Sequence, residues 1–136
     1  MCACNQLRRA SRGITQLYEG ALASSGLKAT QLPILVAVGS AGDLSVSALA
    51  DALALDRTTL TRNLKVLEDR GLLRTRESDD DARVRMVSLT LAGSDVLSNA
   101  LLRWMEMQEV VEERFGRERL TALYEELEAL GDVIEA

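Results

Sequence analysis

One stretch of the chain decides its fold: Asp56-Arg57-Thr58-Thr59-Leu60-Thr61-Arg62-Asn63-Leu64-Lys65-Val66-Leu67-Glu68-Asp69-Arg70-Gly71. Leu60, Leu64 and Leu67 are spaced by four and then three positions, which places them on one face of an α-helix. Asp56 is a good N-cap, and Gly71 suits the left-handed position at which many helices end. The stretch therefore predicts a helix from about Asp56 to Arg70 with a buried leucine face.

The side of this helix opposite its leucines is polar. A helical wheel places on that side Thr58, Thr61, Arg62 and Lys65. Arg57 and Asn63 lie on the flanks, where they are placed to meet phosphates or to pack locally. A helix fits the major groove of B-DNA, where arginine pairs with guanine and threonine meets a phosphate or a base. From the wheel alone, a face that contacts DNA and an ordinary solvated face both remain open.

A shorter helix is expected directly before this one. Ser45 is placed to cap it, and its apolar side consists of Val46, Leu49 and Leu53. A turn of about three residues would then join the two helices, which is the arrangement of a helix-turn-helix.

The period of the apolar residues changes after Gly71. Residues 72–76 and 84–89 are short runs typical of strands, and the polar residues 77–83 between them are typical of a turn. The sequence thus predicts a two-stranded hairpin, or wing, centred on Asp81-Ala82-Arg83.

The tip of this wing carries both signs of charge. Asp81 is placed to pair with Arg83 and set its direction, and an arginine at such a tip can enter the minor groove of DNA. Asp79, Asp80 and Asp81 together oppose attraction to phosphate, although Arg83 and Arg85 would supply it. A plain acidic hairpin turn therefore remains the alternative.

Further helices are predicted on both sides of this unit. An amphipathic helix runs from about residue 7 to 22 and ends at Ser24-Ser25-Gly26. A second helix is expected to start at Thr30 as N-cap, with Pro33 in its first turn, and to break between Gly39 and Gly42. The side chains expected to face inward from it are Leu32, Leu35, Val36 and Val38.

The C-terminal third predicts two long helices. Thr90 is placed to cap the first, and Gly116 interrupts it. The second has a heptad-like seam made of Leu120, Leu123, Leu127, Leu130 and Ile134. Because these helices are long for so small a central unit, we expect the two ends of the chain to form a dimerisation layer.

The predicted fold class is therefore mainly α with a small β-wing: a winged helix-turn-helix with long N- and C-terminal dimerisation helices. We expect a single domain over residues 1–136, which is an ordinary domain size. Its winged core would span residues 30–90, and its dimerisation helices residues 5–25 and 91–136.

Composition argues against several classes of protein. Histidine is absent, which removes Ser-His-Asp and Cys-His catalysis and most zinc sites. We therefore predict that the chain is not an enzyme and uses no cofactor. No apolar run reaches the ~18 residues of a membrane span, and the arginine-bearing N-terminus lacks the apolar segment of a secretory signal. A cytoplasmic protein with no membrane partner is expected.

The net charge of −5 is unevenly distributed. Residues 1–56 are neutral, residues 57–90 carry +2, and residues 91–136 carry −7. The basic surplus thus coincides with the predicted helix and wing, which is the distribution expected of a nucleic-acid-binding protein. The acidic C-terminal helices motivate an alternative function, a protein-interaction module that recruits its partner through them.

At these positions the chain resembles the MarR family of winged helix-turn-helix regulators. The matching residues are Leu55-Asp56-Arg57-Thr58-Thr59-Leu60-Thr61-Arg62, Leu67-Glu68-Asp69-Arg70-Gly71-Leu72, Asp81-Ala82-Arg83 and Leu89-Thr90-Leu91-Ala92-Gly93. The order of helices also fits, so the resemblance covers essentially the whole chain. The chain differs from the family pattern in the acidic residues that precede Asp81.

The resemblance implies a sequence-specific DNA-binding regulator, a homodimer that reads a pseudo-palindromic operator as a repressor. It also implies that the family's DNA-contact positions are occupied here by Thr58, Thr61, Arg62, Asp81 and Arg83. Members often release DNA when they sense a phenolic or lipophilic small molecule or an oxidant. Tyr18, Trp104 and Met105 are candidates to line a pocket for such an effector, the alternative being that they are simply core residues.

Two cysteines, Cys2 and Cys4, stand just before the first predicted helix. The positive end of a helix dipole favours a thiolate, and peroxide sensors of the resembled family use a reactive cysteine in this region. Three interpretations remain open: inert terminal thiols, a redox switch, and a soft-metal site made of four thiols from two chains.

Overall fold

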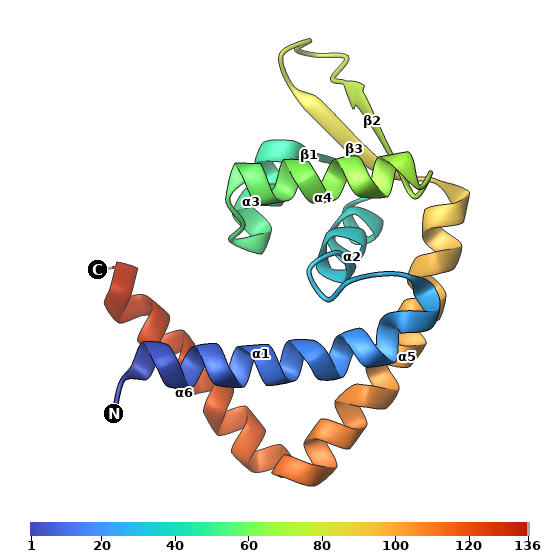
Figure 1. Ribbon diagram of the computed structural model, residues 1–136. Helices are drawn as coiled ribbons and strands as arrows, with labels where there is room; N and C mark the ends of the chain where they lie inside the picture. Colours follow the sequence, from blue (N-terminus) through green and yellow to red (C-terminus); the bar gives the residue numbers. More distant parts are fainter. Residues whose placement is uncertain (136) are drawn as a thin grey trace.

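Helices form most of the protein, of which this computed structural model describes residues 1–135. The elements in order are α1 (Ala3–Leu22), the short 3-10 helix η1 (Ala23–Ser25), α2 (Leu32–Ala41), β1 (Asp43–Ser45), α3 (Val46–Leu53), α4 (Arg57–Asp69), β2 (Leu73–Glu77), β3 (Arg85–Leu89), α5 (Leu91–Phe115) and α6 (Arg117–Glu135). Figure 1 shows a winged lobe from α2 to β3 on one side and a layer of α1, α5 and α6 on the other. The predicted fold class is confirmed.

The helix-turn-helix consists of α3 and α4, and local capping sets where both begin. The Ser45 hydroxyl oxygen accepts the Ala48 N–H at 3.1 Å, and the Asp56 carboxylate accepts the Thr59 N–H at 2.8 Å. Beyond the C-terminal end of α4, Gly71 has a φ of 72°, in the left-handed region where glycine is favoured. The predicted caps and the predicted helix from about residue 56 to residue 70 are confirmed.

The buried face of α4 packs onto the core of the winged lobe. Leu60 and Leu67 are fully buried and Leu64 nearly so. They belong to one cluster with the buried leucines of α1, α2 and α3 and with Val87 of β3. Burial of a leucine side chain stabilises a fold by about 1.5–3 kcal/mol, so this face holds α4 firmly against the lobe.

The sheet has three antiparallel strands in the order β1-β3-β2. Leu44 of β1 and Thr75 of β2 both pair with Val87 of the central strand β3. The prediction of a two-stranded wing was therefore incomplete, because it omitted β1. With three residues, β1 is too short to show a period of two, and its pairing partner is more than forty positions away.

Two predictions for α2 were wrong. Thr30 does not cap it, because the Gln31 side-chain oxygen accepts the Lys28 N–H and closes a turn that places Gln31 at the N-cap. Val36 is exposed, whereas Ile34 is fully buried with Leu35 and Val38.

The predicted end of α2 between Gly39 and Gly42 is confirmed. The helix continues through Gly39 to Ala41, and Gly42 follows it with a φ of 79°. Glycine suits position 39 inside the helix, because the Cβ of any other residue there would press on the side chains of Leu89 and Leu97.

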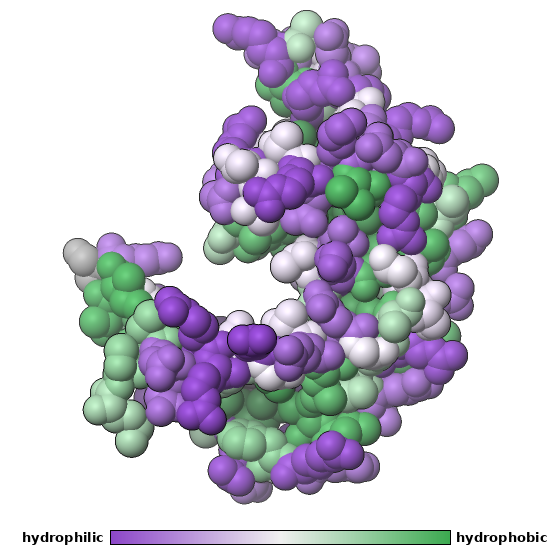
Figure 2. All heavy atoms as spheres, in the orientation of Figure 1, coloured by the Kyte–Doolittle hydropathy of each residue, from purple (hydrophilic) through white to green (hydrophobic). Residues whose placement is uncertain are grey.

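The long helices form the other layer, in which α1 packs along α5 and α6 folds back from α5 after Gly116 (Figure 1). Figure 2 shows hydrophobic surface gathered on this layer, whereas the winged lobe is mostly hydrophilic. The partly exposed large apolar side chains of the layer include Leu7, Ile14, Trp104, Met105, Phe115, Leu123, Leu127, Leu130 and Ile134. Across residues 1–135, no helix has both the length and the apolarity needed to cross a membrane.

Candidate nucleic-acid interface

The outer face of α4 is exposed and polar, as the wheel predicts. Thr58, Thr61, Arg62 and Lys65 are all exposed, while the leucines on the opposite face are buried. With Arg57, these four residues line a shallow open concavity of about 400 Å³. No acidic side chain lines that concavity, so its surface suits an anionic partner.

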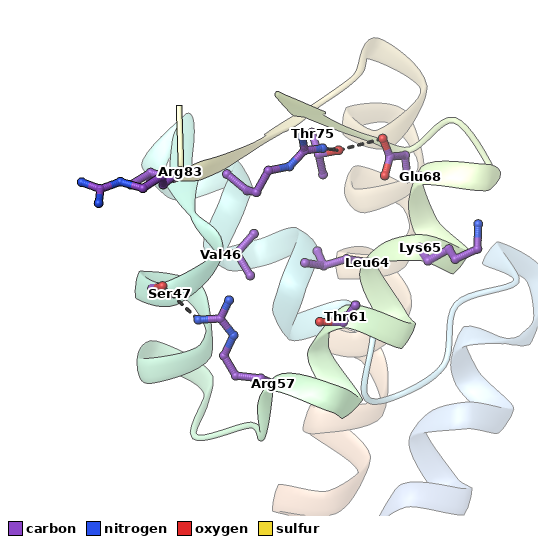
Figure 3. A pocket seen from close by; sticks show the side chains of 11 residues that line it. Val46, Ser47, Arg57, Thr61, Leu64, Lys65, Glu68, Thr75 and Arg83 are labelled. Carbon is purple, nitrogen blue, oxygen red and sulfur yellow. Dashed lines mark hydrogen bonds between the residues drawn. The ribbon is translucent and has the colours of Figure 1, made fainter. Parts of the chain in front are cut away.

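A deeper groove lies between α3, α4 and the wing (Figure 3). Its volume is about 420 Å³, and its charged lining consists of one acidic residue, Glu68, and four cations: Arg57, Lys65, Arg83 and Arg85. Thr61 of the outer α4 face also lines the groove. The fold therefore brings the helix residues and the wing arginines, separated by eighteen or more positions in the chain, around one concave surface.

Arg57 is held at the entrance to α4 by the preceding helix. Its guanidinium donates to the Ser47 hydroxyl oxygen at 3.2 Å, which Figure 3 shows across the groove. Sequence reasoning missed Ser47, because only the packing of α3 against the start of α4 brings it near.

A second arginine, Arg85 of β3, is oriented by a chain of two hydrogen bonds. Its guanidinium donates to the Thr75 hydroxyl oxygen at 2.9 Å, and that hydroxyl donates to the Glu68 carboxylate at 2.8 Å. Glu68 thus stabilises the positive wing strand through Thr75 without pairing directly with Arg85. Neither Glu68 nor Thr75 was predicted, since they lie on different elements and share no sequence motif.

The tip of the wing has the ion pair expected between Asp81 and Arg83. The Asp81 carboxylate accepts the Arg83 backbone N–H at 3.0 Å and two guanidinium N–H groups at 3.2 Å each. These bonds from Arg83 lower the pKa of Asp81 below its usual value, because they stabilise the carboxylate form. The Arg83 side chain is 90% exposed and points outward, away from α4 (Figure 3).

Two of the three predicted effector residues lie together. The rings of Tyr18 and Trp104 stack with centroids 6.2 Å apart, and Tyr18 donates to Gln108 of α5. Tyr18 also lines an apolar groove of about 360 Å³ between α1 and α6, where partial burial raises the pKa of its hydroxyl. Met105 is 54% exposed. The effector role of these residues stays a prediction.

Both cysteines are exposed at the start of α1. Cys2 is the N-cap residue, and the Cys4 sulfur lies 3.6 Å from the Arg8 guanidinium. Cys2 precedes the helix as predicted, whereas Cys4 lies inside its first turn, because α1 begins at Ala3. The role of both thiols stays a prediction. Among residues 1–135, His, Cys, Asp and Glu side chains nowhere gather in a group of three that could hold a metal ion.

Comparison with known proteins gives concordant matches. A family model described as MarR family matches residues 25–84, which include α2, α3, α4 and strand β2 of the wing and end just before β3. A crystal structure of the M. tuberculosis transcriptional regulator MosR in complex with DNA is 35% identical, with a TM-score of 0.89. That match covers 99% of this chain and 97% of MosR.

Two relatives from Bacillus subtilis (strain 168) match in sequence. The HTH-type transcriptional regulator YdgJ is 30% identical over 82% of this chain and 64% of its own length. The organic hydroperoxide resistance transcriptional regulator is 32% identical over 67% of this chain and 62% of its own length. The matched region thus spans less than two thirds of each of these two relatives.

Proposed function

The chain belongs to the MarR family of transcriptional regulators, and from this premise we propose that it is a homodimeric repressor that binds a specific operator in double-stranded DNA. The observation that carries the proposal is the basic groove shared by α4 and the wing. It supports a mode of binding in which α4 enters the major groove and the wing lies against the neighbouring backbone.

Each predicted contact has a chemical role in this proposal. Arg62 pairs with a guanine edge, and Thr58 and Thr61 meet thymine methyl groups or phosphates. Lys65 and Arg57 neutralise phosphates along the flanks of α4, as does Arg85 from β3. Arg83 reaches into the minor groove, and Asp81 holds its guanidinium in direction.

The homodimer is supported by the apolar surface of the helical layer. Leu123, Leu127 and Leu130 of α6 are between 37% and 41% exposed in a single chain, and Leu7 and Ile14 of α1 are similarly exposed. Contiguous exposed apolar side chains of this kind are typical of an interface, and a second copy of the same layer would cover them. The dimer then presents two α4 helices to the two halves of a pseudo-palindromic operator.

Release from DNA is proposed to follow oxidation of Cys2 and Cys4. A thiolate attacks a peroxide oxygen, the O–O bond breaks, and a sulfenic acid and a hydroxide or alkoxide are formed. A second thiol then displaces water from the sulfenic acid to give a disulfide. The exposure of both thiols supports access by peroxide. A small apolar effector near Tyr18 and Trp104 is the other route of release.

The proposal is tested by selecting bound DNA fragments with the purified protein, with and without peroxide. We expect enrichment of a sequence with two related half-sites about one helical turn apart, and weaker enrichment under peroxide. Absent or salt-insensitive binding would instead favour the interaction module, whose acidic helices α5 and α6 lie in the segment that carries the −7 charge.

A further inference from the structure

The loop between α1 and α2 contacts α4 at two points, on the side turned away from the proposed DNA face. We name these contacts the loop clamp: Ser25, Gly26 and Gln31 on the loop, with Asn63 and Arg70 on α4. This loop leads directly from α1, in the helical layer, into the winged lobe (Figure 1).

The first point of the clamp is Arg70, which follows the last residue of α4. Its guanidinium donates to the carbonyl oxygen of Gly26 at 2.9 Å and to that of Ser25 at 3.2 Å. Both carbonyls lie at the C-terminal end of η1, where backbone oxygens lack helical partners and carry partial negative charge. Although Arg70 is exposed within the basic part of the chain, two of its nitrogens are thus occupied by the protein's own backbone.

The second point of the clamp is Gln31. Among residues 1–135 it is the only polar residue that is buried, with 4% of its surface exposed. Its oxygen accepts the Lys28 N–H at 3.0 Å, so its amide nitrogen faces α4 and donates to the Asn63 oxygen at 3.5 Å. The Asn63 nitrogen in turn donates to the Thr59 carbonyl at 3.1 Å. A hydrogen bond to a backbone group therefore orients each of the two side-chain amides. As a result, the amide N–H of Gln31 faces the amide oxygen of Asn63.

The positions of the two points explain what the clamp does to α4. Asn63 and Arg70 are seven residues apart, or about two helical turns, and so lie on the same side of the helix. Leucine burial holds α4 against the core, but apolar contact is non-directional and permits rolling or sliding. Hydrogen bonds depend on direction and distance, so the clamp fixes the roll and the axial position of the helix.

We infer that Gln31 and Arg70 are positioning residues for operator recognition, an inference that rests on the proposed DNA-binding function. They hold α4 at the roll at which Thr61 and Arg62 meet base edges, and they do so without contacting DNA. Loss of the clamp lowers sequence discrimination, whereas attraction to the DNA backbone is retained.

Three variants test this on the full chain: Arg70→Gln, Arg70→Lys and Gln31→Leu. Arg103→Gln is the matched control, since it removes one positive charge from an exposed position on α5. For each protein, anisotropy titrations measure affinity for the DNA fragment selected by the wild type and for a scrambled duplex, over a series of salt concentrations. Thermal unfolding and sedimentation establish that each variant is folded and has the wild-type oligomeric state.

We expect Arg70→Gln to weaken binding to the selected fragment by about tenfold, the factor carried by one charge-assisted hydrogen bond. Binding to scrambled DNA and the slope of affinity against salt should stay at the wild-type values, as they should for Gln31→Leu. Arg70→Lys retains the positive charge but has one donor nitrogen in place of two, so it should give an intermediate loss. It serves if Arg70→Gln does not fold.

Three results would overturn the inference. A salt slope reduced by about one in Arg70→Gln would make Arg70 a phosphate contact. Equal losses on selected and scrambled DNA, or no loss on either, would mean that the clamp does not position α4. If the wild type binds no DNA at all, the proposed function fails first and this inference fails with it.

Discussion

A Cβ atom on Gly93 would lie only 2.0 Å from the carbonyl oxygen of Leu72, so the first turn of α5 lies directly against the backbone that follows α4. Thr90 reinforces this joint, because its N–H donates to the Leu72 carbonyl and its hydroxyl donates to the Gly71 carbonyl. The Thr90 hydroxyl oxygen also caps α5 by accepting the Gly93 N–H at 3.0 Å. The helical layer and the end of α4 are therefore joined backbone to backbone.

Gly93→Ala should destabilise the fold by about 1–3 kcal/mol or more, because the added methyl meets backbone that a rotamer change cannot move. The midpoint of urea unfolding measures this loss. Gly20→Ala is the matched control: nothing lies within 4 Å of its Cβ position, so it should leave stability unchanged or raise it by up to about 1 kcal/mol. Equal midpoints for Gly93→Ala and wild type would contradict the close approach.

Asp56→Ala should lower the unfolding midpoint at neutral pH, since the α4 cap is lost, whereas Asp56→Asn keeps a side-chain oxygen for the Thr59 N–H. The backbone and side-chain hydrogen bonds from Thr59 hold the pKa of Asp56 below 3.8. Because the pKa of Asp56 is lower in the folded protein, its carboxylate stabilises the fold fully at pH values above 3.8. This stabilisation is lost as the pH falls through the pKa of the folded state.

The comparison of these two variants with wild type is made by urea unfolding at neutral pH and in acid. An amide does not titrate, so Asp56→Asn should lose less stability between neutral pH and acid than the wild type loses. An Asp56→Ala protein as stable as wild type at neutral pH would show that the cap contributes nothing to α4.

Asp81→Asn should weaken operator binding while strengthening binding to scrambled DNA. The amide orients the Arg83 guanidinium less strongly than the carboxylate does, and the loss of one negative charge increases attraction to phosphates. Asp80→Asn removes the same charge from the neighbouring residue, so it should strengthen binding to both duplexes. If the two variants behave alike in anisotropy titrations, Asp81 acts only through its charge and does not direct Arg83.

Peroxide should weaken operator binding by the wild type, and a thiol reductant should restore it. The Cys2→Ser/Cys4→Ser protein should bind equally well with and without peroxide, because it has no thiol left to oxidise. Mobility-shift assays with both proteins measure this, and free-thiol titration follows the oxidation itself. If the wild type keeps its affinity for the operator after both thiols have been oxidised, the proposed redox switch is wrong.

The structural features that were best predicted from the sequence are those that depend on residues close together in the chain. The caps at Ser45, Asp56 and Thr90 and the glycine after α4 are local features, and all four are confirmed. The buried leucines of α4 were likewise predictable, because they repeat at helical spacing within thirteen residues.

What the sequence could not show are contacts between remote segments. Strand β1 exists only because β3 pairs with it, and Arg70 meets the carbonyl of Gly26 across forty-four positions. The cap of α2 was misplaced at Thr30 because a side-chain bond inside the turn, from Lys28 to Gln31, competes with ordinary capping. The contacts of Arg85 with Thr75 and of Arg57 with Ser47 likewise depend on how the elements pack.

The central claim is that α4 and the wing read DNA, and affinity for the selected operator tests it most directly. Anisotropy titrations compare wild type with Arg62→Ala/Arg83→Ala, two exposed residues whose loss leaves the core intact. We expect a loss of about 1–3 kcal/mol for each base contact removed, hence at least a tenfold weaker complex. A double variant that binds the operator with undiminished affinity would contradict it.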